Sequence, residues 1–220
     1  VERISHHENQ VQVHSEHAQL AVDALLIASG RQPATASLHP ENAGIAVNER
    51  GAIVVDKRLH TTADNIWAMG DVTGGLQFTY ISLDDYRIVR DELLGEGKRS
   101  TDDRKNVPYS VFMTPPLSRV GMTEEQARES GADIQVVTLP VAAIPRARVM
   151  NDTRGVLKAI VDNKTQRMLG ASLLCVDSHE MINIVKMVMD AGLPYSILRD
   201  QIFTHPSMSE SLNDLFSLVK

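Results

Sequence analysis

The order of apolar and polar residues divides the chain into stretches with different periodicities. In the first 33 residues, two valines alternate with polar neighbours at residues 10–14, and the polar run at residues 6–10 marks the tip of a hairpin. The apolar run at residues 24–28 has the length of a buried strand, which Gly30 ends. We therefore predict β structure for this part of the chain.

The next part of the chain, up to residue 104, carries two short apolar runs and one helical pattern. Residues 51–56 predict a turn followed by a short strand, and the run at residues 66–69 predicts a short buried strand. From residue 79 to residue 94, apolar residues recur at the spacing of one helix face, and Gly95 ends the pattern. The residues expected on the buried face of this helix are Ile81, Tyr86, Ile88, Val89 and Leu93.

After a charged linker at residues 96–106, strands and helices are interleaved. Thr123 with Gln126 three residues later is a capping box that begins a helix, and Gly131 ends this helix. A longer helix is predicted to start at a cap formed by Asp177 or Ser178 and to end near Gly192. Strands are predicted at residues 109–113, 118–122, 134–139, 156–161 and 168–174, the last two as a hairpin. This order predicts an α+β layer.

Composition and charge exclude several classes of function. The chain has 220 residues, of which 43% are hydrophobic, so it can form one large core or two modest ones. Its net charge of -6 argues against nucleic acid as a partner, because phosphate binding requires clustered lysine and arginine. No apolar run approaches the roughly 20 residues of a membrane span.

The cysteine and histidine residues give no sign of a disulfide or a metal site. Cys175, the single cysteine, sits in the apolar run at residues 171–176 and is expected to be a small buried hydrophobe. A chain without an internal disulfide fits a reducing compartment, and we expect a cytoplasmic protein. His6 and His7 are adjacent but lack a third ligand at suitable spacing, so we expect a solvated turn there and no metal.

A first candidate site lies where the run at residues 66–69 meets Gly70 and Asp71. Glycine lets a ligand approach the backbone closely, and a carboxylate accepts hydrogen bonds from sugar-like hydroxyls. The free N–H groups at the start of the helix near Thr79 would face the same ligand. Taken alone, these residues are more often a plain turn than a ligand site.

Four stretches of the chain together resemble the class I pyridine nucleotide-disulfide oxidoreductases, the family of glutathione reductase, lipoamide dehydrogenase and mercuric reductase. They occur in the order that the family requires, and the resemblance covers essentially the whole chain. The stretches are Thr61–Val72, which is similar to the second flavin motif of the family, Ala28–Pro33, Val107–Ala127 and His205–Glu210.

The resemblance implies an α/β and α+β fold, namely the C-terminal part of a flavoprotein with two dinucleotide-binding domains, followed by an α+β dimerisation domain. Residues 1–33 would end the NAD(P)-binding domain, residues 34–106 would complete the FAD-binding domain and a linker, and residues 107–220 would form a homodimer. The implied cofactors are FAD and NAD(P)H. The implied cofactor-binding residues are Gly30, Gly70, Asp71, Gln77, Phe78, Thr79 and Tyr80.

Members of this family carry a G-x-G-x-x-G turn and a C-x-x-x-x-C pair in their N-terminal half, and neither motif occurs in this sequence. We therefore expect the chain to be the C-terminal half of a longer enzyme and to be inactive alone.

His205 and Glu210 form the second candidate site. Ser207 with Glu210 three residues on is a capping box for the last helix, and this structural role alone would explain Glu210. The resemblance implies a catalytic role, in which His205 is the acid-base residue, Glu210 orients its ring, and both serve the active site of the other subunit. An imidazole that titrates near neutrality can hold and return the proton that a leaving thiolate requires.

The electron acceptor depends on the branch of the family. Residues 83–86 replace the small residues of most members and are similar to a bacterial subgroup near mercuric reductase that includes the reactive-chlorine-resistance oxidoreductase. The tail at residues 216–220 has no cysteine pair, unlike mercuric reductase, which also lacks the counterpart of His205. We expect a disulfide or an oxidised thiol as the small-molecule acceptor. The alternatives are reduction of a mercuric- or cupric-type metal ion and a non-catalytic dimerisation module.

Overall fold

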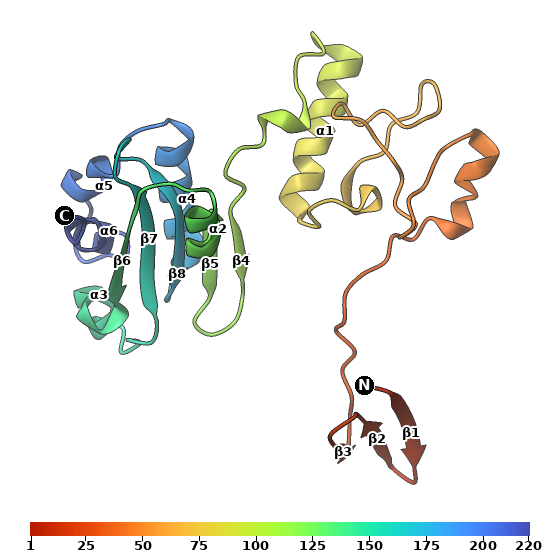
Figure 1. Ribbon diagram of the computed structural model, residues 1–220, viewed down its shortest axis with the longest axis horizontal. Coiled ribbons are helices and arrows are strands. Elements are labelled where there is room, and N and C mark those ends of the chain that lie inside the picture. The colour runs from red at the N-terminus through yellow and green to blue at the C-terminus, as the bar shows by residue number, and fades with distance from the viewer. The chain divides into compact units, whose positions relative to one another are not determined.

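The computed structural model describes residues 1–220, which form two compact units, Val1–Thr101 and Asp102–Lys220 (Figure 1). The two units are described separately below. None of their helices combines the length and the apolar character that a membrane span requires.

Unit 1 begins with a three-stranded antiparallel sheet in the order β1-β2-β3. Its strands are β1 (Arg3–His7), β2 (Gln10–His14) and β3 (Gln19–Val22). A tight turn joins β1 to β2, and Glu8 within it adopts a left-handed φ of 53°. The hairpin predicted from the polar run at residues 6–10 is therefore confirmed.

The three other strands predicted in unit 1 are wrong for this chain. Residues 24–28 form no regular element, and Leu26 in this run is 87% exposed. The runs at residues 51–56 and 66–69 contain only isolated bridges, Val47 with Ile53 and His60 with Trp67. A strand is held by the neighbours that bond to its backbone, and no strand of the unit lies beside these runs.

The helix predicted from residue 79 is present as α1 (Thr79–Leu94), and the N–H of Gly95 caps it by donating to the carbonyl of Asp91 at 2.9 Å. Its buried face differs from the prediction, because Tyr86 and Leu93 are 48% and 55% exposed. The residues that α1 buries are Ile81, Asp85 and Ile88. Short 3₁₀ turns complete the path of the chain at η1 (Ala36–Leu38), η2 (Pro40–Ala43), η3 (Gly70–Thr73) and η4 (Thr101–Asp103).

Unit 2 is built on a five-stranded antiparallel sheet in the order β4-β5-β8-β7-β6. The strands are β4 (Tyr109–Val111), β5 (Leu117–Gly121), β6 (Ile134–Pro140), β7 (Val156–Asp162) and β8 (Met168–Leu174). The helices are α2 (Glu124–Glu129), α3 (Pro145–Val149), α4 (Ser178–Asp190), α5 (Ser196–Asp200) and α6 (Ser211–Ser217), with a 3₁₀ turn at η5 (Val141–Ala143). All five predicted strands and the hairpin β7–β8 are confirmed.

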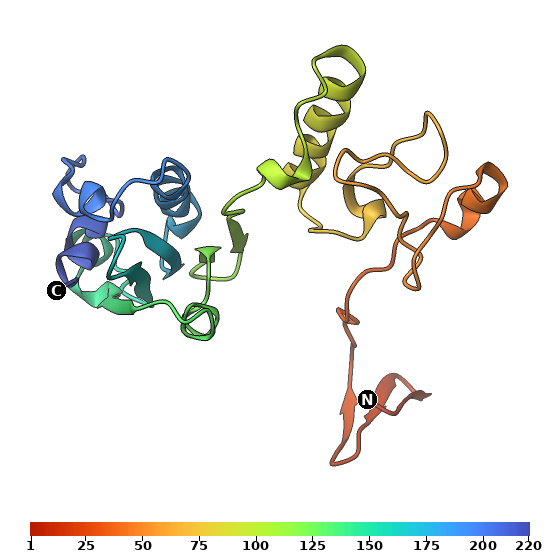
Figure 2. The ribbon, with the colours of Figure 1, turned by 45° about the horizontal axis from the view of Figure 1, so that its top comes forward.

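The core of unit 2 lies between one face of the sheet and the helices. Helix α4 packs on β5 and β8, and α6 packs on β6 and β7 (Figures 1 and 2). The core residues include Leu157 and Leu173 of the sheet, Met181, Ile182 and Val185 of α4, and Leu212, Leu215 and Phe216 of α6. This layer of helices on an antiparallel sheet confirms the predicted α+β architecture.

Three helix starts in unit 2 were predicted from sequence, and that of α6 is described below together with His205. The capping box of α2 is confirmed, since the hydroxyl of Thr123 accepts the Gln126 N–H and the Gln126 side chain accepts the Thr123 N–H. At α4, Asp177 occupies the cap position but its side chain makes no capping bond. The hydroxyl of Ser178 instead donates to the Pro116 carbonyl at 2.8 Å, which fixes the helix start to the sheet.

Candidate functional site

The turn at Gly70 is fixed to α1. Gly70 has a left-handed φ of 78°, and a Cβ atom there would lie 3.0 Å from the hydroxyl of Ser82. The Gly70 N–H donates to a carboxylate oxygen of Asp85 at 2.6 Å, and the Thr73 hydroxyl donates to the Gly70 carbonyl at 2.9 Å. Glycine is required here because a side chain would be strained by the backbone angle and would press on α1.

Asp71 follows directly in the turn η3, and its side chain is half exposed at 51%. The Arg31 guanidinium lies 3.8 Å from this carboxylate. Both groups remain open to solvent, so this contact is weak and a ligand can replace it. The carboxylate is thus free to accept hydrogen bonds from hydroxyl groups.

The start of α1 lies next to this turn. Phe78 occupies the cap position, and its side chain makes no capping hydrogen bond. The first-turn amides of a helix carry partial positive charge and can bind an electronegative group. Aromatic side chains flank this end, with Phe78 37% exposed and Tyr80 68% exposed under the guanidinium of Arg87.

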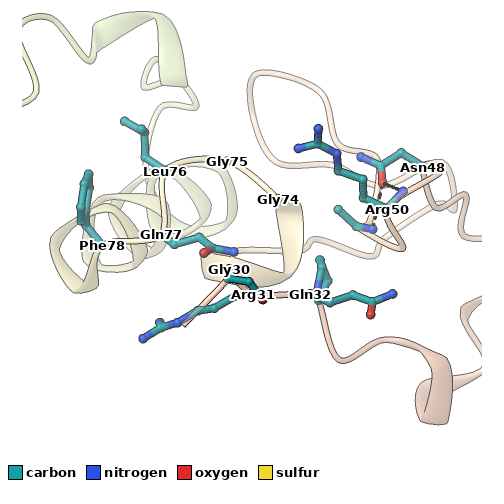
Figure 3. Close-up of a pocket in the computed structure, with 13 residues that line it drawn as sticks. Gly30, Arg31, Gln32, Asn48, Arg50, Gly74, Gly75, Leu76, Gln77 and Phe78 are labelled. Carbon is teal, nitrogen blue, oxygen red and sulfur yellow. Dashed lines mark hydrogen bonds between the residues drawn. The ribbon is translucent and has the colours of Figure 1, made fainter. Parts of the chain in front are cut away.

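A cavity of about 700 Å³ lies between the segment at Gly30 and the loop at residues 74–78. Figure 3 shows the two segments facing each other, with the Gln77 side chain between them. Asn48 and Arg50 form part of the wall, and the Asn48 carboxamide accepts the Arg50 N–H at 2.9 Å. A smaller hollow beside it, of about 360 Å³, is lined by Arg31, Asp71 and Gln77.

The seven residues predicted to bind cofactors therefore lie in one part of unit 1. Gly30, Gln77 and Phe78 line the larger cavity, and Asp71 lines the smaller one. Gly70 shapes the turn, and Thr79 and Tyr80 form the first turn of α1.

Three residues at this site were not predicted to be site residues, namely Asn48, Arg50 and Asp85, of which Asp85 was noted only within the subgroup pattern at residues 83–86. The Asn-Glu-Arg-Gly sequence at residues 48–51 is a turn signal, which Asn48 completes by accepting backbone N–H groups. Asp85 falls between Ile81 and Ile88 on the buried face of α1, and a carboxylate in an apolar stripe is a detectable signal of a polar task.

In unit 2, His205 and Glu210 are in contact. The Nδ1 atom of His205 lies 2.8 Å from Oε2 of Glu210. The other carboxylate oxygen of Glu210 accepts the Ser207 N–H at 3.2 Å, and the Ser207 hydroxyl accepts the Glu210 N–H at 3.2 Å. These reciprocal bonds have the pattern of a capping box, but they lie in the turn before α6, which begins at Ser211 with Glu210 in the cap position and no side-chain capping bond. The predicted cap position at Ser207 is therefore wrong, and one carboxylate makes both the bond to this turn and the histidine contact.

The exposure of this pair is uneven. The His205 side chain is 73% exposed, whereas that of Glu210 is 16% exposed. A carboxylate at Nδ1 selects the tautomer that carries hydrogen on Nδ1 and leaves Nε2 as the basic atom. His205 therefore presents Nε2 to solvent while Glu210 fixes its ring.

The backbone before His205 is anchored by a residue that the sequence did not indicate. The Asn213 amide of α6 donates to the carbonyls of Leu198, Arg199 and Gln201 at 2.7, 3.0 and 3.0 Å. Helix α6 itself is fixed in the core by Leu212, Leu215 and Phe216, which are fully buried. The chain that leads to His205 is therefore hydrogen-bonded to a helix that is itself packed in the core.

Neither unit contains a metal-ligand cluster, because no three side chains of histidine, cysteine, aspartate or glutamate lie together. Cys175 is buried in the core, as predicted. Burial and the nearby charge of Asp177 raise the pKa of its thiol to about 12. This cysteine is thus a packing residue and not a nucleophile.

The sequence models of one family match both units. Residues 1–85 match the model described as pyridine nucleotide-disulphide oxidoreductase. Residues 107–216 match the model described as pyridine nucleotide-disulphide oxidoreductase, dimerisation domain.

Individual relatives extend this similarity over most of the chain. Mercuric reductase from Staphylococcus aureus is 35% identical over 202 residues, which cover 92% of this chain and 37% of that protein. Mercuric reductase from Streptomyces lividans is 36% identical over 194 residues, covering 88% of this chain and 41% of that protein. The crystal structure of LpdA from Mycobacterium tuberculosis matches with a TM-score of 0.89 at 22% identity, covering 100% of this chain and 48% of that one. The chain thus spans less than half the length of each, and the last comparison supports the fold.

Proposed function

Because the chain belongs to the pyridine nucleotide-disulphide oxidoreductase family, we propose that it forms the C-terminal part of a reductase. This reductase would pass electrons from NAD(P)H through FAD to a cysteine-disulfide centre and on to a disulfide or an oxidised thiol. The observation that carries the proposal is the contact of the His205 ring with Glu210 at 2.8 Å, which leaves Nε2 open to an acceptor.

Unit 1 has the chemistry to hold part of FAD. The exposed carboxylate of Asp71 suits a hydroxyl of the sugar-like chain, and the uncapped start of α1 suits an electron-rich ring edge or a phosphate. The cavity beside Gly30 and Gln77 provides space for a cofactor portion. FAD, when bound, supplies the two-electron chemistry between NAD(P)H and the acceptor.

His205 would hold and transfer the proton that disulfide reduction requires. Reduction of a disulfide to thiols consumes protons as well as electrons, so the leaving sulfur needs an acid close by. In the proposed role, Nε2 of His205 holds this proton and gives it to the departing thiolate. Glu210 keeps the ring in one orientation and stabilises the protonated imidazole through Nδ1.

The proposal includes a homodimer formed through residues 107–220, which the match to a dimerisation domain supports. It also includes a cytoplasmic location, which the reduced, buried Cys175 supports. The proposal further includes the subgroup of the reactive-chlorine-resistance oxidoreductase, near mercuric reductase, to which residues 83–86 are similar.

One observation favours a second function, the reduction of a soft metal ion. The curated relatives that match over 86–92% of this chain at 34–36% identity are named mercuric reductases. In such a reaction no leaving thiolate has to be protonated, so His205 would have no acid-base task.

Steady-state oxidation of NAD(P)H by the full-length enzyme separates these functions. The proposed function predicts turnover with disulfides or oxidised thiols and a large loss of that turnover in His205→Ala. Turnover with mercuric or cupric salts alone, unchanged in His205→Ala, would support metal-ion reduction instead. A protein that neither takes up FAD nor oxidises NAD(P)H would be a dimerisation module.

A further inference from the structure

Asp85 is the one charged side chain in the chain that is almost fully buried, with 2% exposure. It lies on the face of α1 that also buries Ile81 and Ile88. Removing a carboxylate from water is costly unless the surrounding protein supplies hydrogen-bond donors. A buried aspartate in the middle of an apolar helix face therefore indicates that its carboxylate accepts specific hydrogen bonds.

The Gly70 backbone is a hydrogen-bond donor to Asp85. The Oδ2 atom of Asp85 accepts the Gly70 N–H at 2.6 Å, and hydrogen bonds to a carboxylate are stronger than those between neutral groups. Gly70 is the first residue of η3, so its N–H cannot bond within the 3₁₀ turn itself. Asp85 thus holds the first amide of the turn against α1.

This bond has a consequence for the next residue. Asp71 follows Gly70 directly, and its carboxylate faces solvent from the same turn. A side chain at position 70 would press on Ser82 of α1, so only glycine lets the turn lie at this distance from the helix. Asp85 from one side and the Thr73 hydroxyl from the other fix both polar groups of the Gly70 backbone.

We propose that Asp85 is a positioning residue of the FAD site, which acts through the Gly70 N–H to hold the Asp71 carboxylate ready for a cofactor hydroxyl. The inference rests on the proposed function, because it assigns Asp71 to FAD. A fixed carboxylate binds without first losing conformational freedom, so the anchor strengthens binding although Asp85 does not touch the ligand.

The neighbouring residue provides a matched control. Asp84 has the same side chain in the same helix, but its carboxylate pairs with Arg99 at 2.9 Å in the loop after α1. Replacing Asp84 removes a carboxylate from α1 but leaves the bond between Asp85 and the Gly70 N–H in place. FAD affinity is expected to stay within about twofold in Asp84→Ala, because the ion pair that is lost joins α1 to the loop after it and not to the turn.

The test is a double-mutant cycle on FAD affinity in the full-length enzyme, measured by fluorescence titration of the apoprotein. Asp85→Ala is expected to weaken FAD binding about tenfold or more, whereas Asp85→Asn, whose amide oxygen can still accept the Gly70 N–H, retains most of the affinity. In the Asp71→Ala background, Asp85→Ala should weaken binding far less. Rescue by asparagine and non-additivity with Asp71 are effects that a general loss of stability would not produce.

The outcomes separate this inference from the proposed function. If the wild-type enzyme binds FAD and Asp71→Ala weakens it, but Asp85→Ala costs the same factor with and without Asp71, the positioning role is overturned alone. If the wild-type enzyme binds no FAD, the proposed function fails and the inference fails with it. Should Asp85→Ala not fold, the cycle is made with Asp85→Asn, for which a smaller loss that disappears in Asp71→Ala supports the role and an additive loss overturns it.

Discussion

The contact between His205 and Glu210 predicts that activity and stability respond differently to the same substitution. His205→Ala removes the proton carrier, whereas Glu210→Gln keeps an oxygen for the Ser207 N–H and removes the charge next to Nδ1. The structure allows the size of each effect to be worked out, because the two side chains differ in exposure.

The effect on stability should be small. His205 is 73% exposed, so water screens its pairing with Glu210, and such a pair contributes about 0–1 kcal/mol to folding. In a domain of the size of unit 2, 1 kcal/mol corresponds to a shift of roughly 4 °C in Tm, which is the upper limit expected for His205→Ala.

The effect on turnover should be large. A positioned acid or base contributes about 10²–10⁴-fold, so His205→Ala should slow turnover with a thiol-type acceptor by that factor. Glu210→Gln exchanges a charge-assisted bond for a neutral one, which costs about 1.5 kcal/mol, or roughly tenfold. Reduction of the flavin by NAD(P)H should be unchanged in both variants.

The assay measures turnover, dimer content and Tm on the same samples, across pH. The loss of turnover in His205→Ala should be present at every pH at which the variant is folded. His179→Ala is the matched control, because His179 is another histidine of unit 2 beside a carboxylate, at 3.9 Å from Glu180, and lies outside the site. Normal turnover per folded dimer of His205→Ala would refute the acid-base role, as would an equal loss in His179→Ala.

Other residues give independent predictions. Asp71→Ala should weaken FAD binding about ten- to hundredfold, as loss of a charge-assisted hydrogen bond does, and unchanged flavin content after dialysis would refute its assignment. Phe216→Ala should destabilise unit 2 by about 3–5 kcal/mol in chemical denaturation, because the ring is fully buried, and a change below about 1 kcal/mol would contradict this packing. Cys175 should resist a thiol reagent at neutral pH until the protein unfolds, since burial raises its pKa to about 12, and rapid labelling of the native protein would contradict this. The pKa of Asp91 is lowered, chiefly by the backbone N–H of Arg99 and against the effect of desolvation. Its stabilising bonds to the loop after α1 should therefore be complete above about pH 4, the range of an unfolded aspartate, and be lost as pH falls through the lower folded pKa. The amides of Lys98 and Arg99 donate to Asp91, so their hydrogen exchange, corrected for intrinsic rates, should become faster as pH falls below about 4. Corrected exchange rates that do not change with pH in this range would contradict the prediction.

The sequence predicted those elements whose signals are local. Helix α1 begins and ends at the predicted residues because its periodicity and the stop at Gly95 lie within a single stretch. The capping box of α2 and the hairpin β7–β8 are likewise set by neighbouring residues.

The predictions that failed, and the features that were missed, depend on contacts with residues distant in the sequence or on elements too short to show a pattern. The run at residues 24–28 has a strand-like composition, but a strand requires neighbours and unit 1 supplies none. Helices α3 and α5 have five residues each, too few for a helical period to be visible. The position of Asp85 in an apolar stripe is visible in the sequence, but its partner Gly70 is not, and neither are the backbone carbonyls that Asn213 binds, because these groups are distant in sequence.

The central claim is that this chain belongs to a working flavoenzyme, and the flavin content of the purified full-length protein tests it most directly. The account predicts a yellow protein with about one FAD per chain, whose flavin absorbance is bleached by NAD(P)H under anaerobic conditions and returns when a disulfide or an oxidised thiol is added. A colourless protein that takes up no FAD when the cofactor is supplied would contradict the account.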